Sequence, residues 1–200
     1  MARDEELIKI TDRLPENEEV CKSILEMLNN GDVAIEKDDK STTSLYLVMQ
    51  NKIVIGNIKE NFARIQTIAH ECIHSVQNKK ILKFNYIFSN IYLLYFWIIV
   101  ICALFRNPSL LEARNIFLII LIIFGCVYYI VRGLLEVDAM TRAPFIAKQY
   151  MKNTKLLSKE EIDLICKKYD ELNRMGIPIY IFILGIKTVI KMVIYCALLV

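Results

Sequence analysis

The only two histidines of this 200-residue chain lie four residues apart, in His70-Glu71-Cys72-Ile73-His74. The segment matches the pattern HExxH, and in a helix this spacing places both histidines on one face, one turn apart. Their imidazoles can then bind one Zn²⁺ at about 2.0 to 2.1 Å. Glu71 follows the first ligand and can reach a water in the site as a general base without binding the metal itself.

Two simpler interpretations of this pattern stay open. The histidines can be an ordinary pair on a helix face, hydrogen-bonded to backbone or water, or the match can be accidental. Cys72 lies about 200° from His70 around the helix, so we assign it to packing. The six cysteines include no CxxC pair, and we expect all of them to be reduced and structural.

Residue periodicity predicts the elements that precede the histidines. Apolar residues at helical spacing over residues 5–29, interrupted by Pro15, indicate two short amphipathic helices that end at Asn30-Gly31. Residues 44–56 carry two β-rich runs around a polar turn and therefore predict a β-hairpin.

The helix that carries the histidines is predicted from a capping pattern. Asn57 and Glu60 have the spacing of a capping box, which predicts a helix from about residue 58 to 80. Residues 1–85 are then the N-terminal part of a mainly helical α+β domain with a small hairpin or sheet.

The charged residues indicate a membrane segment in the middle of the chain. Residues 86–131 hold three charged side chains, whereas residues 1–85 hold 26. The uncharged stretches are 86–105 and 116–131, and the first of them, at about 1.5 Å per residue, spans a hydrocarbon core of about 30 Å. We therefore predict a transmembrane hairpin over residues 86–135, with the lipid bilayer as a partner.

The C-terminal third is polar at first and then apolar. Residues 136–175 are predicted to be mostly helical, with a capping box at Ser158 and Glu161. Gly176 and Pro178 are expected to end this helical part.

The last segment, residues 176–200, is apolar except for Lys187 and Lys191. The two lysines share one helix face, so the segment crosses the membrane a third time, packs against the other helices or lies at the interface.

A catalytic zinc site needs a third protein ligand and an open position. No further histidine exists, so this ligand must be a carboxylate. A residue beyond position 86 can meet the histidines only after an even number of crossings, and the predicted hairpin returns the chain at about residue 132. Glu136 is the first acidic residue after that point, and we predict it as the third ligand.

The HExxH helix, the hydrophobic hairpin and the segment that begins at Glu136 together resemble the gluzincin membrane proteases. The second motif is most similar to E-x-D-A-S-R-R-A of the bacterial neutral zinc metallopeptidase family. The corresponding residues here are Glu136, Asp138, Ala139, Arg142 and Ala143. HtpX-like membrane proteases are similar but usually carry an aspartate four residues after the glutamate, where this chain has Met140.

The resemblance covers about residues 44–175 and implies a zincin-like catalytic domain that a transmembrane hairpin interrupts. It implies one Zn²⁺, a peptide or membrane-protein substrate, and a role for residues 45–55 in lining the substrate cleft. For Asp138 it implies support of a ligand histidine, and for Arg142 contact with a substrate carbonyl. The simpler interpretation of these two is a surface ion pair between residues four apart on a helix, worth under about 1 kcal/mol.

The distribution of basic residues predicts the side on which the site lies. Lysines and arginines gather at both open ends of the hairpin, whereas the connecting loop has only Arg106 and Arg114. By the positive-inside rule, the catalytic side of this multi-pass cell-membrane protein is cytoplasmic. The formal net charge of +3 does not indicate the strongly basic surface that nucleic-acid binding needs. We therefore do not expect nucleic acid as a partner.

The sequence thus predicts a membrane-embedded zinc metalloendopeptidase with ligands His70, His74 and Glu136 and the base Glu71. One alternative is a catalytically silent zinc-binding regulator that holds a partner at the membrane. Another is a small membrane interaction protein in which HExxH is accidental.

Overall fold

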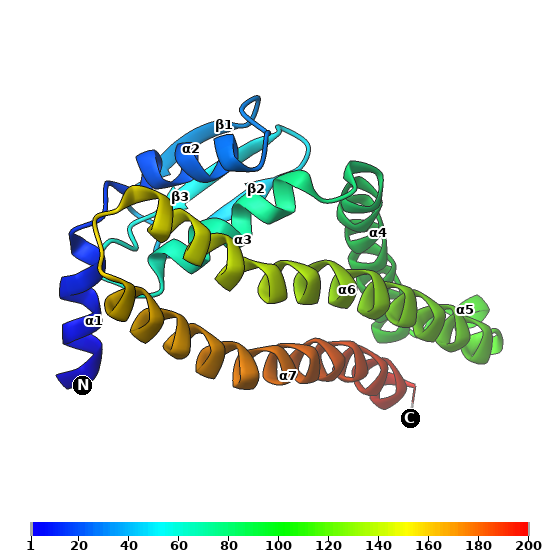
Figure 1. Cartoon of the computed structure of the whole chain (residues 1–200). Helices are drawn as coiled ribbons and strands as arrows, with labels where there is room; N and C mark the ends of the chain where they lie inside the picture. Colours follow the sequence, from blue (N-terminus) through cyan, green and yellow to red (C-terminus); the bar gives the residue numbers. More distant parts are fainter. Residues whose placement is uncertain (1, 200) are drawn as a thin grey trace. The chain divides into compact units, whose positions relative to one another are not determined.

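A computed structural model describes residues 2–199 of the chain, which is mainly helical with a small three-stranded mixed sheet (Figure 1), and this confirms the predicted fold class. Its contacts divide the chain into two compact units. The sheet unit comprises residues 2–79 and 137–177, and the helical unit comprises residues 80–136 and 178–199.

The sheet unit begins with two short helices, α1 (Ala2–Asp12) and α2 (Asn17–Met27), which Pro15 separates as predicted. The sheet follows, with β1 (Ala34–Asp38), β2 (Leu45–Leu47) and β3 (Lys52–Gly56) in the order β1-β3-β2.

The hairpin predicted over residues 44–56 is confirmed, because β2 pairs antiparallel with the central strand β3. β1, which pairs parallel with β3, was not predicted. Its sequence, AIEKD, places charged residues at three of five positions and lacks the apolar alternation that marks a half-buried strand.

The helix that carries the histidines, α3 (Arg64–Val76), is shorter at both ends than the predicted 58–80. The predicted capping box at Asn57 and Glu60 is wrong, because Ala63 is the N-cap and the Asn57 N–H donates instead to the Ser41 carbonyl, at 2.7 Å. Gly56 also lies close to the loop that contains Ser41 and Thr43. A Cβ at Gly56 would meet the Thr43 carbonyl oxygen at 2.7 Å. This packing holds the chain after β3 in a non-helical path, so the helix begins later.

Arg64 anchors α3 to the turn between α1 and α2. Its side chain is fully buried, and it donates hydrogen bonds to the carbonyls of Thr11, Leu14 and Pro15 and to the Asn17 side chain. Burial lowers the Arg64 pKa, but arginine keeps its charge at neutral pH. Two of these carbonyls, those of Leu14 and Pro15, follow the end of α1, and the third, that of Thr11 in its last turn, also accepts the Leu14 N–H.

The longest helix, α6 (Arg114–Thr154), runs without a break from the helical unit into the sheet unit. In the sheet unit it contributes Ala139, Ala143 and Ala147, four residues apart and fully buried, to the same core as Ile68 and Cys72 of α3. Alanine lets neighbouring groups approach closely, so this face of α6 is fixed against the core.

α6 continues through Pro144, which has no N–H to donate to the carbonyl of Met140, four residues earlier. The side chain of Asn173 supplies the missing bond, because its Nδ2 donates to the Met140 carbonyl at 2.6 Å. The Oδ1 of Asn173 in turn accepts from Gln66 of α3, at 2.8 Å. One side chain therefore joins α6 and α3 and keeps α6 helical at its proline.

Asn173 belongs to α7 (Lys159–Leu198), which begins with the predicted capping box. The Ser158 N–H donates to Glu161, and the Glu161 N–H donates to the Ser158 Oγ. The predicted stop at Gly176 and Pro178 is wrong, because α7 continues to Leu198. Gly176 lies against the Met140 side chain of α6, at 3.5 Å from a Cβ built there, whereas Pro178 is exposed.

The helical unit consists of α4 (Lys79–Leu104), α5 (Pro108–Glu112), the first part of α6 and the last part of α7. α4, α6 and α7 are each long and apolar enough to cross a membrane. Gly125 of α6 marks a close approach, since a Cβ there would meet the Thr188 side chain of α7 at 2.6 Å. Small residues at such contacts are typical of packed membrane helices.

We expect Asn173→Ala to destabilise the chain by about 1 to 3 kcal/mol, because it leaves the Met140 carbonyl without a donor. In a Pro144→Ala background the new backbone N–H can bond that carbonyl, so Asn173→Ala should cost about 1 kcal/mol less there. Thermal unfolding of the four proteins in detergent measures this difference. An equal loss in both backgrounds would contradict the role given to Asn173.

Candidate metal centre

α3 presents both histidines on one face. The His70 and His74 Nε2 atoms lie 3.0 Å apart, and their rings are nearly perpendicular, at 88°. Two ligands of a tetrahedral zinc ion, each about 2.1 Å from it, are about 3.4 Å apart. The two nitrogens thus converge, and they lie about 0.4 Å closer together than in a tetrahedral zinc site.

Glu136 completes a group of three potential ligands. The ligand atoms of His70, His74 and Glu136 all lie within 4.8 Å of one another. Glu136 precedes Val137 directly in α6, so the helix that packs into the core of the sheet unit from Ala139 onward also fixes its backbone. Two imidazoles and one carboxylate are the donor set of a catalytic zinc site, so these residues could hold one metal ion.

The side chain of Gln77 forms a hydrogen bond with the imidazole of His74. The sequence did not predict this contact. The His74 Nδ1 and the Gln77 Oε1 lie 2.8 Å apart, and because the amide oxygen only accepts, Nδ1 carries the proton. The Nε2 of His74 is then left with its lone pair for a metal. The only signal in the sequence was the position of Gln77, three residues after His74.

Asp138 is linked to His74 indirectly, through the side chain of Gln77. Its Oδ2 accepts a hydrogen bond from the Gln77 Nε2, at 2.7 Å, and so fixes which end of the amide faces His74. The resemblance implied that Asp138 supports a histidine, and the structure places Gln77 between them.

Arg142 pairs with the same oxygen of Asp138, at 3.3 Å. Both side chains are nearly half exposed, 45% and 43%, so the pair contributes little to stability.

Glu71, the predicted base, lies against the sheet. Its side chain is buried, and its Oε2 accepts the N–H of Tyr46 in β2, at 2.7 Å. β2 pairs with β3 on one side only, so the Tyr46 N–H points out from the edge of the sheet toward the helix. The edge strand and the carboxylate of Glu71 are therefore neighbours.

Arg132 binds the third potential ligand from within α6. Its Nη2 lies 2.7 Å from the Glu136 Oε1, one helical turn away. The Glu136 side chain is only 8% exposed, and a nearby cation offsets the cost of burying its charge. A carboxylate has two oxygens, so a guanidinium and a metal ion can share it.

No model of a known protein family, no curated protein and no solved structure matches the chain. The geometry of the centre therefore carries the functional argument by itself.

We expect Gln77→Ala to weaken zinc binding about 10- to 100-fold, because His74 loses the acceptor that fixes its tautomer and orientation. Competition with a chromogenic chelator measures the affinity. Arg142→Gln is the matched control, because it removes the other contact of the Asp138 carboxylate and leaves Gln77 in place. Equal zinc affinity of the Gln77→Ala variant and the wild type would show that Gln77 does not position His74.

Proposed function

We propose that the chain is a membrane zinc metalloendopeptidase of the gluzincin type. The observation that carries the proposal is the convergence of His70, His74 and Glu136, with Glu71 next to the first ligand. Zinc held by these three side chains supplies a Lewis acid that polarises a peptide carbonyl and makes a water more acidic.

Glu71 provides the acid–base chemistry. Its carboxylate takes a proton from the attacking water and passes it to the departing amine, so that the peptide bond breaks without a free strong acid or base. Burial and the hydrogen bond from Tyr46 hold this carboxylate in a defined place. A fixed base avoids the entropic cost of bringing it to the water.

The outer edge of β2 is the proposed docking place for substrate. An edge strand can pair with an extended peptide through outward backbone groups that nothing else binds; the Tyr46 N–H is not one of them, because Glu71 binds it. The hydrogen bond from the Tyr46 N–H to the Glu71 carboxylate supports this proposal, because Glu71 lies beside this edge. We therefore propose unfolded peptide segments or extended parts of membrane proteins as substrates.

We propose that the chain lies in the cell membrane and that its metal centre lies on the cytoplasmic side. Three helices long and apolar enough to cross support contact with a bilayer, and their large apolar side chains are widely exposed. The basic residues at the ends of the hairpin support the cytoplasmic orientation.

We expect Glu71→Gln to keep bound zinc and to lose cleavage of an unfolded protein substrate by at least about 100-fold, because the base is removed while all three ligands stay. Metal analysis of the purified protein and a gel-based cleavage assay are the two measurements. Glu19→Gln, an exposed glutamate of α2, is the control and should change neither.

Glu136→Ala should lower zinc content by removing one of three ligands. Wild-type protein that binds no zinc would refute the proposal as a whole. Zinc binding without cleavage of any unfolded or membrane substrate would instead indicate a silent regulator.

A further inference from the structure

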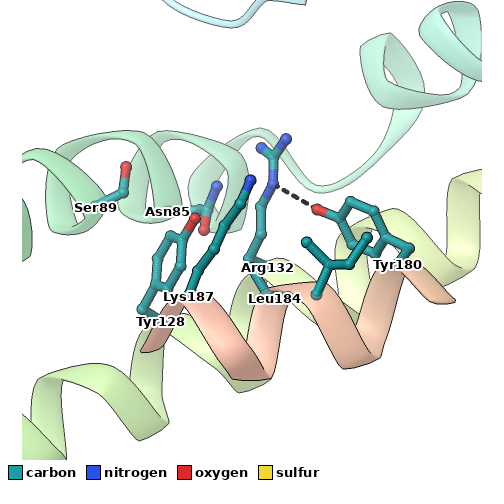
Figure 2. A pocket seen from close by; sticks show the side chains of 8 residues that line it. Asn85, Ser89, Tyr128, Arg132, Tyr180, Leu184 and Lys187 are labelled. Carbon is teal, nitrogen blue, oxygen red and sulfur yellow. Dashed lines mark hydrogen bonds between the residues drawn. The ribbon is translucent and has the colours of Figure 1, made fainter. Parts of the chain in front are cut away.

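The helical unit contains a polar cavity of about 260 Å³ between α4, α6 and α7. Figure 2 shows its lining, in which polar and charged ends of the side chains point into one space. The lining residues are Asn85, Ser89, Tyr128, Arg132, Tyr180, Ile183, Leu184 and Lys187. All of them belong to the helical unit, and none of them is acidic.

Two cations face this cavity, Arg132 and Lys187. In the described part of the chain, Lys187 has neither an ion pair nor a hydrogen bond. Lys191, one turn further along α7, differs, because its Nζ lies 4.0 Å from the centre of the Tyr92 ring. A cation in an apolar helix is costly unless it has a partner. Lys191 has the Tyr92 ring, whereas Lys187 has no such partner among the described residues.

Hydrogen-bond donors surround the two cations. The Asn85 side chain is only 6% exposed, lines the cavity and has no hydrogen-bond partner among the residues that the structure describes. Tyr180 accepts from the Arg132 Nε at 3.3 Å, so its own hydroxyl proton is available to an acceptor (Figure 2). Both donors face the cavity, where an oxygen-rich ligand would accept their hydrogen bonds.

The lining residues all lie near the points where the chain passes between the two units. Asn85 follows residue 80 by five positions, Arg132 precedes residue 136 by four, and Lys187 follows residue 178 by nine. At about 1.5 Å per residue, all are within about 15 Å of these ends of the membrane helices. The headgroup layer is about 5 to 8 Å thick on each side of the hydrocarbon core, so Asn85 and Arg132 lie at its depth, and Lys187, which lies deeper, can extend its long side chain toward it.

We propose that this cavity binds the phosphate of an anionic phospholipid. Arg132 and Lys187 neutralise the phosphate, and Asn85 and Tyr180 donate hydrogen bonds to its oxygens. A lipid fits better than a soluble phosphate because Ile183 and Leu184 form an apolar wall on the side of α7, whose outer face is also apolar.

The lipid site would act on the metal centre through Arg132, an extension that rests on the proposed function. The Arg132 Nη2 binds the Glu136 Oε1, so a phosphate that draws the guanidinium into the cavity loosens its hold on the proposed ligand. Anionic lipid should then raise zinc affinity, and zinc should raise lipid affinity by the same factor.

Native mass spectrometry of the full chain, stripped of metal and titrated with phosphatidylglycerol or phosphatidylcholine of the same acyl chains, tests the lipid site without the metal centre. We expect the wild type to retain phosphatidylglycerol preferentially. Lys187→Gln should weaken this retention about tenfold, because one charge-assisted contact is lost. Lys187→Arg should restore it, and Lys191→Gln is the matched control that removes a neighbouring cation outside the cavity lining.

Equal retention of the two lipids would overturn the proposal, as would equal losses in Lys187→Gln and Lys191→Gln. Displacement of the lipid by millimolar inorganic phosphate would assign the cavity to a soluble anion instead. Zinc affinity measured in nanodiscs of each lipid tests the coupling separately. An affinity that is the same in both would refute the link through Arg132 while leaving the lipid result to stand by itself.

Discussion

The candidate metal centre depends on the packing of α6 into the core of the sheet unit. Glu136 has a fixed place only because the next residues of the same helix pack into the core of the sheet unit through Ala139, Ala143 and Ala147. A proline in that stretch removes one main-chain hydrogen bond, and the side chain of Asn173 replaces it. A contact outside the centre thus supports the helix that carries the third ligand.

The parts of the centre that the sequence predicts best are those that depend on local geometry. The spacing of His70 and His74 places them on one helix face in any α-helix, and this made the pair recognisable without knowledge of the fold. Glu136 lies 62 positions beyond His74, yet the two predicted crossings narrowed the choice, because they return the chain to the side of the histidines. The hydrophobic pattern was in this way used to predict a partner distant in sequence.

The parts that were not predictable depend on neighbours distant in sequence. The start of α3 was misplaced because the contact of Gly56 with the loop at Thr43 outweighs the local capping pattern of Asn57. α7 continues past Gly176 and Pro178, so these local stop signals did not predict where the helix ends. The role of Gln77 became visible only with its contacts to His74 and Asp138, since a glutamine has no pattern of its own.

The bond between Asn173 and α6 also has a consequence for the order in which the protein is made. Asn173 comes 29 positions after Pro144, so a growing chain completes α6 before the donor that supports its proline exists. Until α7 is synthesised and docks, α6 has a weak point eight residues beyond Glu136. A chain that ends before residue 173 thus has both histidines and Glu136 but lacks the side chain that bonds the Met140 carbonyl.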